Sequence, residues 1–262
     1  MKEVYIVATT ASEALASDAI IEAFETDDAQ VVLDEDDALF SIRSETSRID
    51  VRFETRLAPL GWTPDILSGL PELHERLRAA TGFYRVSIVP GQQQGSVAVF
   101  EALWTIRTLL EMVDGVVVDS TALKIHSQVD IEEITELDFD IRDHLTIHAM
   151  DVNQGQMWVH SHGMIKFGAQ DVEMFGIREE DLAAAETFLH ELCTDLAFGQ
   201  GPAQRQIVQT SVGMTFSMLP CDEGRSTLFG VDPENFDGHM SGILPLIGAE
   251  GKHNLGDMLE QY

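Results

Sequence analysis

The chain has 262 residues, of which 45 are Asp or Glu and 16 are Lys or Arg, so its formal net charge at pH 7 is −29 with histidine neutral. This charge argues strongly against binding to a nucleic-acid backbone, which requires Lys and Arg, and it disfavours an anionic membrane surface. Hydrophobic residues make up 44% of the chain, which is close to the globular average and too high for a chain kept disordered by its charge.

The acidity has two interpretations that composition does not separate. It keeps the protein soluble in an acid-biased proteome, or it forms an acidic face that docks a basic protein partner. Carboxylates occur in an acidic turn at 34–37, in a segment at 130–143 and on helix faces. This spread favours solvation over a single docking patch.

The first residues and the cysteines indicate a cytoplasmic protein. Residues 1–7 contain one lysine and a short apolar run, which predicts a strand and not a signal peptide. No apolar run approaches the roughly 20 residues of a membrane span. Cys193 and Cys221 have no metal or redox spacing, and Cys193 lies on the apolar stripe of a predicted helix, where a buried, inert thiol is expected.

The first half of the chain alternates between strands and helices. Residues 49–53 alternate apolar and polar side chains, as in a half-buried strand, and residues 29–54 together predict an antiparallel meander. Pro71 is expected to break the helix at 67–80. The strands are predicted at 4–8, 31–33, 38–43, 49–53, 83–89 and 116–118, and the helices at 11–24, 67–80 and 94–113. The last helix has its apolar stripe at Val97, Phe100, Leu103, Trp104, Leu110 and Val113, with Arg107 as the polar exception.

The second half contains further strands and one long amphipathic helix. Two extended stretches, 144–152 and 156–162, flank Asn153-Gln154-Gly155 and predict a hairpin. Residues 180–198 predict a helix with Glu186, Glu191 and Asp195 facing water. The other predicted elements are strands at 171–175, 206–209, 214–219 and 226–229, and a helical turn at 255–259.

This order of elements predicts the α+β class, with mixed, largely antiparallel sheets and amphipathic helices packed on one face. Two α+β units are expected, residues 1–126 and 143–262, packed against each other; one compact domain is the alternative. Each unit has a meander and an amphipathic helix, which is compatible with a duplication. The acidic boundary at 127–143 is not a flexible linker, because it contains Ile131, Ile134, Leu137, Phe139 and Ile141.

Sequence motifs of catalysis are missing. No phosphate-binding lysine loop and no Gly-x-Ser-x-Gly elbow occur. Residues 91–95, with two glycines, predict a plain helix entry, and the oxygen-rich stretch 232–238 breaks the calcium-loop pattern at Phe236. We therefore assign no catalytic residue and expect no cofactor. The sequence favours a protein that is not an enzyme.

A cluster of histidines is the one positive signal of a site. His148 lies on one face of its strand, and His160 and His162 share a face of theirs. A three-residue turn would pair Val152 with Gln156 and place His148 opposite His160. A two-residue turn would shift the register by one residue, so that the histidines of the two strands would lie on opposite faces of the hairpin. Neutral imidazoles in this geometry bind zinc or another divalent metal, to which Asp171 or Glu173 would add a carboxylate. The alternatives are a hydrogen-bonded polar sheet face and a pH-sensitive surface.

The segment 160–173, HSHGMIKFGAQDVE, resembles the pattern of an uncharacterised bacterial family of domains of unknown function, distantly like immunity-type binding domains. The resemblance covers roughly residues 64–198 and implies that Gly163 and Gly168 serve turns. It implies a binding protein with no established activity. His160 and His162 depart from the family pattern, so the resemblance implies no histidine site.

Together these observations predict a non-catalytic protein-interaction module with an acidic surface and a protein partner, which the charge suggests is basic. The alternative is a metal-binding protein or metal-dependent hydrolase that uses His148, His160 and His162.

Overall fold

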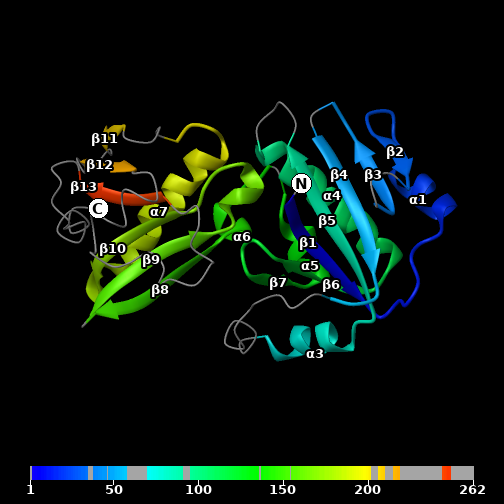
Figure 1. Cartoon of the computed structure of the whole chain (residues 1–262), viewed down its shortest axis with the longest axis horizontal. Helices are drawn as coiled ribbons and strands as arrows, with labels where there is room; N and C mark the ends of the chain where they lie inside the picture. The colour runs from blue at the N-terminus through cyan, green and yellow to red at the C-terminus, as the bar shows by residue number, and fades with distance from the viewer. Residues whose placement is uncertain are drawn as a thin grey trace. The chain divides into compact units, whose positions relative to one another are not determined.

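A computed structural model describes residues 2–34, 38–45, 47–57, 70–90, 95–135, 137–153, 155–201, 206–209, 215–218 and 244–248 (Figure 1). The chain divides into two compact units, residues 1–143 and 144–262, so the acidic segment 127–143 belongs to the first unit. Each unit contains a β-sheet with helices packed against it, which confirms the predicted α+β class. Among the described helices, none has the length and apolarity needed to cross a membrane.

The first unit is built on a seven-stranded antiparallel sheet. Its strand order is β2-β3-β4-β5-β1-β6-β7, so the predicted meander forms one edge and the N-terminal strand lies between β5 and β6. The strands are β1 (Lys2–Thr9), β2 (Gln30–Leu33), β3 (Phe40–Arg43), β4 (Ser47–Glu54), β5 (Gly82–Pro90), β6 (Gly115–Asp119) and β7 (Lys124–His126).

Helices lie on both faces of this sheet. Helix α4 (Gly95–Met112) packs on β4, β5 and β1, and helix α1 (Ser17–Phe24) contacts α4 and β2. Helix α3 (Pro71–Ala79) contacts β1 and β6 and covers an apolar cluster on the other face. The members of that cluster are Ile6, Ala8, Phe83, Val116, Val118 and Ile125.

Three predicted helices differ from the structure in informative ways. The chain before α1 is not helical from residue 11, because the Leu15 amide donates to the Tyr84 hydroxyl at 3.0 Å and ties this stretch to β5. Pro71 begins α3, where a missing N–H costs nothing, and residues 67–69 of the predicted helix lie outside the described residues. The predicted stripe of α4 is only partly right: Trp104 and Phe100 contact Phe24 and Phe139, while the residues buried most deeply are Val99, Ala102, Leu103, Ile106 and Leu109.

The acidic segment forms two short helices in the first unit. Helix α5 (Gln128–Glu133) begins with a capping box between Ser127 and Asp130, and α6 (Ile141–His144) follows at the boundary between the units. Ile131 is fully buried and Ile134 and Ile141 are nearly so, which confirms that this segment packs. Leu137 was expected to help hold it, and that prediction is wrong, since the side chain is 96% exposed.

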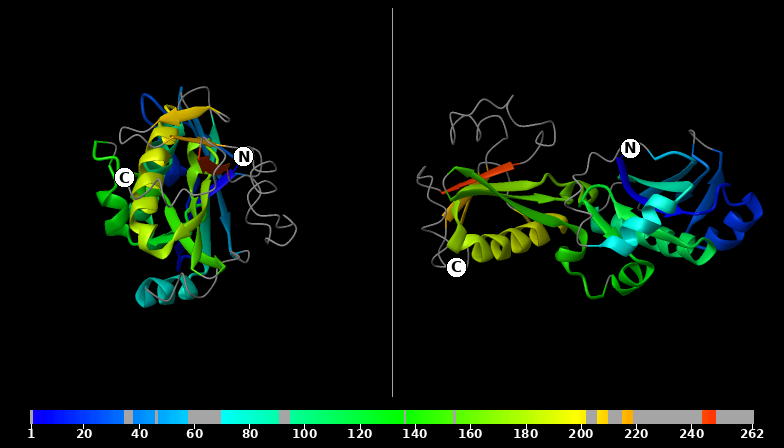
Figure 2. Two further views of the ribbon diagram at one scale, coloured as in Figure 1. Left: turned by 90° about the vertical axis from the view of Figure 1, so that its left-hand side faces the viewer. Right: turned by 90° about the horizontal axis from the view of Figure 1, so that it is seen from below.

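The second unit contains a six-stranded sheet in the order β11-β12-β13-β10-β9-β8, with one parallel pair, β10 and β13. Helix α7 (Leu182–Ala197) lies along one face of this sheet (Figure 2). The strands are β8 (Thr146–Asn153), β9 (Gln156–His162), β10 (Val172–Arg178), β11 (Ile207–Gln209), β12 (Thr215–Met218) and β13 (Leu244–Gly248), and two 3-10 turns are η1 (Met164–Phe167) and η2 (Glu179–Asp181).

The predictions for the second unit are confirmed for the hairpin and for α7, whose Glu186, Glu191 and Asp195 are exposed. Strand β13 was not predicted. The expectations for 91–94, 226–229, 232–238 and 255–259 lie outside the described residues.

Candidate functional site

The β8–β9 hairpin has the histidine register that the sequence analysis gave for a three-residue turn, one of the two alternatives left open. His148 lies opposite His160, and Thr146 lies opposite His162. The turn itself differs from the prediction, because Asn153, not Val152, pairs with Gln156. A bulge between Asp151 and Asn153 inserts one extra residue into β8 and restores the register. The shorter turn shifts the strand register by one residue and the bulge shifts it back, so the histidines share one face.

The three imidazoles are neighbours on this face. The ring centroid of His162 lies 5.0 Å from that of His148 and 4.8 Å from that of His160, in edge-to-face geometry. The rings of His148 and His160 are 5.8 Å apart and nearly parallel. The three residues named by the sequence thus come together.

An aromatic layer continues from the histidines across β9 and β10. Trp158 stacks on His160 with ring centroids 3.7 Å apart, and Phe175 stacks on Trp158 at 5.7 Å. Glu173 lies opposite His160 in the register, is fully buried and accepts a hydrogen bond from the Trp158 indole at 3.0 Å. Since His160 is only 4% exposed, this part of the face is a packed layer and not an open site.

The arrangement gives little support to a metal centre. Within the described residues, no group of three or more His, Cys, Asp or Glu side chains is arranged to hold a metal ion. Of the two carboxylates considered, Glu173 lies beside His160, whereas Asp171 accepts from the Ser161 hydroxyl at 3.0 Å and from the Met164 amide at 3.1 Å. Burial lowers the pKa of His148, which favours a neutral imidazole there.

The opposite face of β9 packs toward α7 and is structural. Ser161 donates to Asp171, accepts from the Val172 amide at 3.0 Å, and hydrogen-bonds to Cys193 of α7. Burial raises the pKa of the Cys193 thiol to about 12, so the thiol stays protonated at neutral pH. Cys193 is free and buried, as the sequence predicted.

Two glycines shape the chain that follows β9. Gly163 has φ of 130°, and a Cβ there would meet the His144 carbonyl oxygen at 2.7 Å. Gly168 has φ of 74° and open space around the position of a Cβ. Both angles lie in the region that favours glycine.

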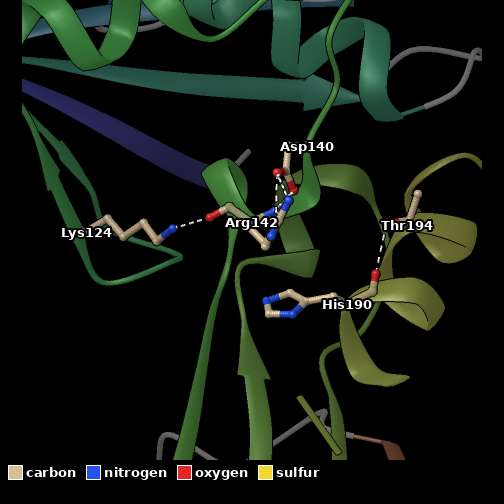
Figure 3. A network of polar contacts seen from close by, with 5 residues as sticks. All are labelled: Lys124, Asp140, Arg142, His190 and Thr194. Carbon is tan, nitrogen blue, oxygen red and sulfur yellow. Dashed lines mark hydrogen bonds and ion pairs between the residues drawn. The ribbon is translucent and has the colours of Figure 1, made fainter. Parts of the chain in front are cut away.

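The second candidate surface is the acidic segment 127–143, whose backbone is hydrogen-bonded to Arg107. The Arg107 guanidinium donates to the Ile131 carbonyl at 3.0 Å and also to the Ile134 carbonyl. Figure 3 shows the end of the segment, where Lys124 donates to the Arg142 carbonyl and Arg142 pairs with Asp140 at 2.6 Å. In α7, the same view shows the Thr194 hydroxyl donating to the His190 carbonyl at 2.8 Å, an ordinary helical contact.

Apolar side chains are exposed on this acidic segment. Val129 is 60% exposed and Leu137 is 96% exposed, whereas the neighbouring isoleucines are buried. The same segment has exposed carboxylates at Asp130, Glu132, Glu133 and Asp138. Burial, and to a lesser extent the nearby charge of Asp140, raise the pKa of Asp143. Sequence reasoning missed these two side chains, because it counted Leu137 with the packed residues.

Comparison with known proteins finds no significant match: no protein-family model, no curated protein and no solved structure resembles the chain closely enough to assign it. The resemblance of residues 64–198 to a bacterial family therefore stays a prediction, and the function is argued from the geometry alone.

Proposed function

We propose that the protein is a non-catalytic interaction module that binds a basic segment of another protein through the acidic segment 127–143. The observation that supports the proposal is the exposure of Leu137 within a stretch of 17 residues that has seven carboxylates and one arginine. A partner that places an apolar side chain on Leu137 and flanks it with Lys or Arg would complement both features.

The segment is held in place before any partner arrives. Ile131 and Ile134 are buried, Arg107 binds their carbonyls, and the ring of Phe139 packs on Phe100 with centroids 6.0 Å apart. A preformed surface loses less conformational entropy on binding than a flexible one does. This supports binding by the segment as it stands, without folding on contact.

Capture from a lysate of the source organism tests the proposal when matched variants are compared. L137S removes the exposed leucine, and L70S, which removes a leucine that is 42% exposed elsewhere in the first unit, is the control. We expect a basic protein to be retained by the wild type and by L70S at low salt, and to be lost with L137S or at high salt. Burial of one leucine contributes about 1.5–3 kcal/mol, which corresponds to at least a tenfold loss of affinity. Equal capture by all variants, or capture of no basic protein, would contradict the proposal.

The alternative is a zinc-dependent role of His148, His160 and His162. Its support is the convergence of the three rings; the stacking of His160 on buried Trp158 favours packing instead. Metal analysis of protein purified without a histidine tag separates the two. The interaction module predicts far less than one equivalent of zinc, and a full equivalent that disappears in H148Q would favour the alternative.

A further inference from the structure

Arginines gather on one face of strands β3, β4 and β5. Of the 16 basic residues in the chain, twelve are arginines, and within the described residues four of them lie on this face. Arg43 lies opposite Arg48, and Arg52 lies opposite Arg85. Alternation along β4 places Asp50, between Arg48 and Arg52, on the same face.

These two cross-strand pairs place like charges directly opposite each other. Residues in such positions have Cβ atoms about 4.5–5.5 Å apart, and like charges there destabilise a sheet. The cost is incurred twice on one face, in a chain with a net charge of −29. A local arrangement that opposes folding is typical of a functional site.

Carboxylates within the face hold the arginines in place. Asp50 is fully buried, and its Oδ1 accepts from the Ser41 hydroxyl at 2.7 Å and from Arg48 Nε at 2.6 Å. Asp50 Oδ2 is also buried and accepts no hydrogen bond. Glu54 accepts from one nitrogen of Arg85 with both oxygens, at 3.0 and 3.1 Å.

The arginines of this face are partly accessible even where carboxylates hold them. The side chains of Arg48 and Arg85 are 23% and 27% exposed, so their guanidinium groups are partly desolvated yet within reach of a ligand. Partial burial strengthens the attraction of an anion.

We propose that this arginine face, formed by Arg43, Arg48, Arg52 and Arg85, binds a small ligand that carries a phosphate or diphosphate group. A guanidinium has five N–H donors in a planar fork that matches phosphate oxygens, so one arginine can hold a carboxylate and contact a ligand together. Four guanidinium groups offer more N–H donors than the two oxygens of a ligand carboxylate can accept. They suit the larger number of oxygens in a diphosphate.

The total charge decides between a small ligand and a nucleic acid. Charges farther away than about 8–10 Å are largely screened at physiological salt, so the distant carboxylates of this chain hardly oppose a small anion. A nucleic acid would extend beyond the arginine face over other parts of a chain whose net charge is −29. The face therefore fits a compact anion.

Calorimetric titration with inorganic pyrophosphate tests the proposal. We expect saturable binding to the wild type, and binding at least about tenfold weaker to R52Q, which is a loss of about 1.4 kcal/mol. R142Q is the control, because it removes the same charge from an exposed arginine of the first unit that pairs with Asp140 outside the face. Its affinity should stay within about twofold of the wild type.

Absence of saturable binding to the wild type would overturn the proposal, and so would an equal loss in R52Q and R142Q, which would indicate a general effect of charge. Circular dichroism verifies that each variant is folded, and R85Q replaces R52Q if the latter does not fold. R52K gives a further check: it keeps the charge without the planar fork, and its affinity should lie between those of the wild type and R52Q.

Discussion

The histidines of the β8–β9 hairpin differ in how far they are buried. His160 lies beneath the ring of Trp158 and is 4% exposed, whereas His148 and His162 are half-buried. The alternation of residues along two strands predicted a shared face for only one of the two turn lengths considered, and the structure reaches that register through a shorter turn and a bulge in β8. Alternation did not predict the stacking on Trp158, because ring contacts depend on rotamers and not on spacing.

Burial of His148 makes the stability of the protein depend on pH. Its folded-state pKa lies below the ordinary value of 6.5, so the unfolded chain binds the proton more readily. The free energy of unfolding should therefore fall as pH decreases through about 6.5 and should be unaffected by this group well above it. Denaturant titrations between about pH 8 and pH 5 measure this. H148Q should show a weaker decrease, and an equal decrease in both proteins would refute the assignment.

Among the elements, the turn after β9 depends on the backbone of two glycines. Gly163 has both a positive φ and a close approach to the His144 carbonyl, whereas Gly168 has the positive φ alone. We expect G163A to destabilise the protein by about 2–4 kcal/mol, because it adds a steric clash to the strain of the angle, and G168A by about 1–2 kcal/mol. Chemical denaturation gives both values. A larger effect of G168A would show that the clash is relieved by a small shift.

Some of the helices and strands could be predicted from the sequence, and others could not. Periodicity predicted α7 and the meander, whose polar and apolar residues separate cleanly. It placed the buried side of α4 only partly correctly, because this helix is covered by the sheet and also contacts α1 and α5. It missed the arginine face, since residues 49–53 showed one polar side of a strand but not which strands would lie beside it.

At the scale of the whole molecule, the two compact units divide near residue 143. Because the seven-stranded sheet and α4 lie within residues 1–143, we expect a fragment of these residues to fold alone. It should unfold cooperatively in urea and retain the near-ultraviolet signal of its buried tyrosines, Tyr5 and Tyr84. A fragment without a cooperative transition would show that the first unit needs the second for its stability.

The net charge of −29 acquires a more specific meaning from the structure. Acidic residues are distributed over both units, yet two surfaces of the first unit stand out from that background. One is the acidic segment 127–143 with exposed Leu137, and the other is the arginine face. Composition alone predicted neither, because a sum of charges contains no positions.

Amide hydrogen exchange of the full chain, with and without the captured basic protein, tests the proposed function most directly. The acidic segment should gain protection at residues 128–138, with little change in β8 and β9. The same protection should be lost at high salt, because screening weakens contacts between exposed charges. Protection confined to the β8–β9 hairpin, or no protection of 128–138, would contradict the assignment of the acidic segment as the binding surface.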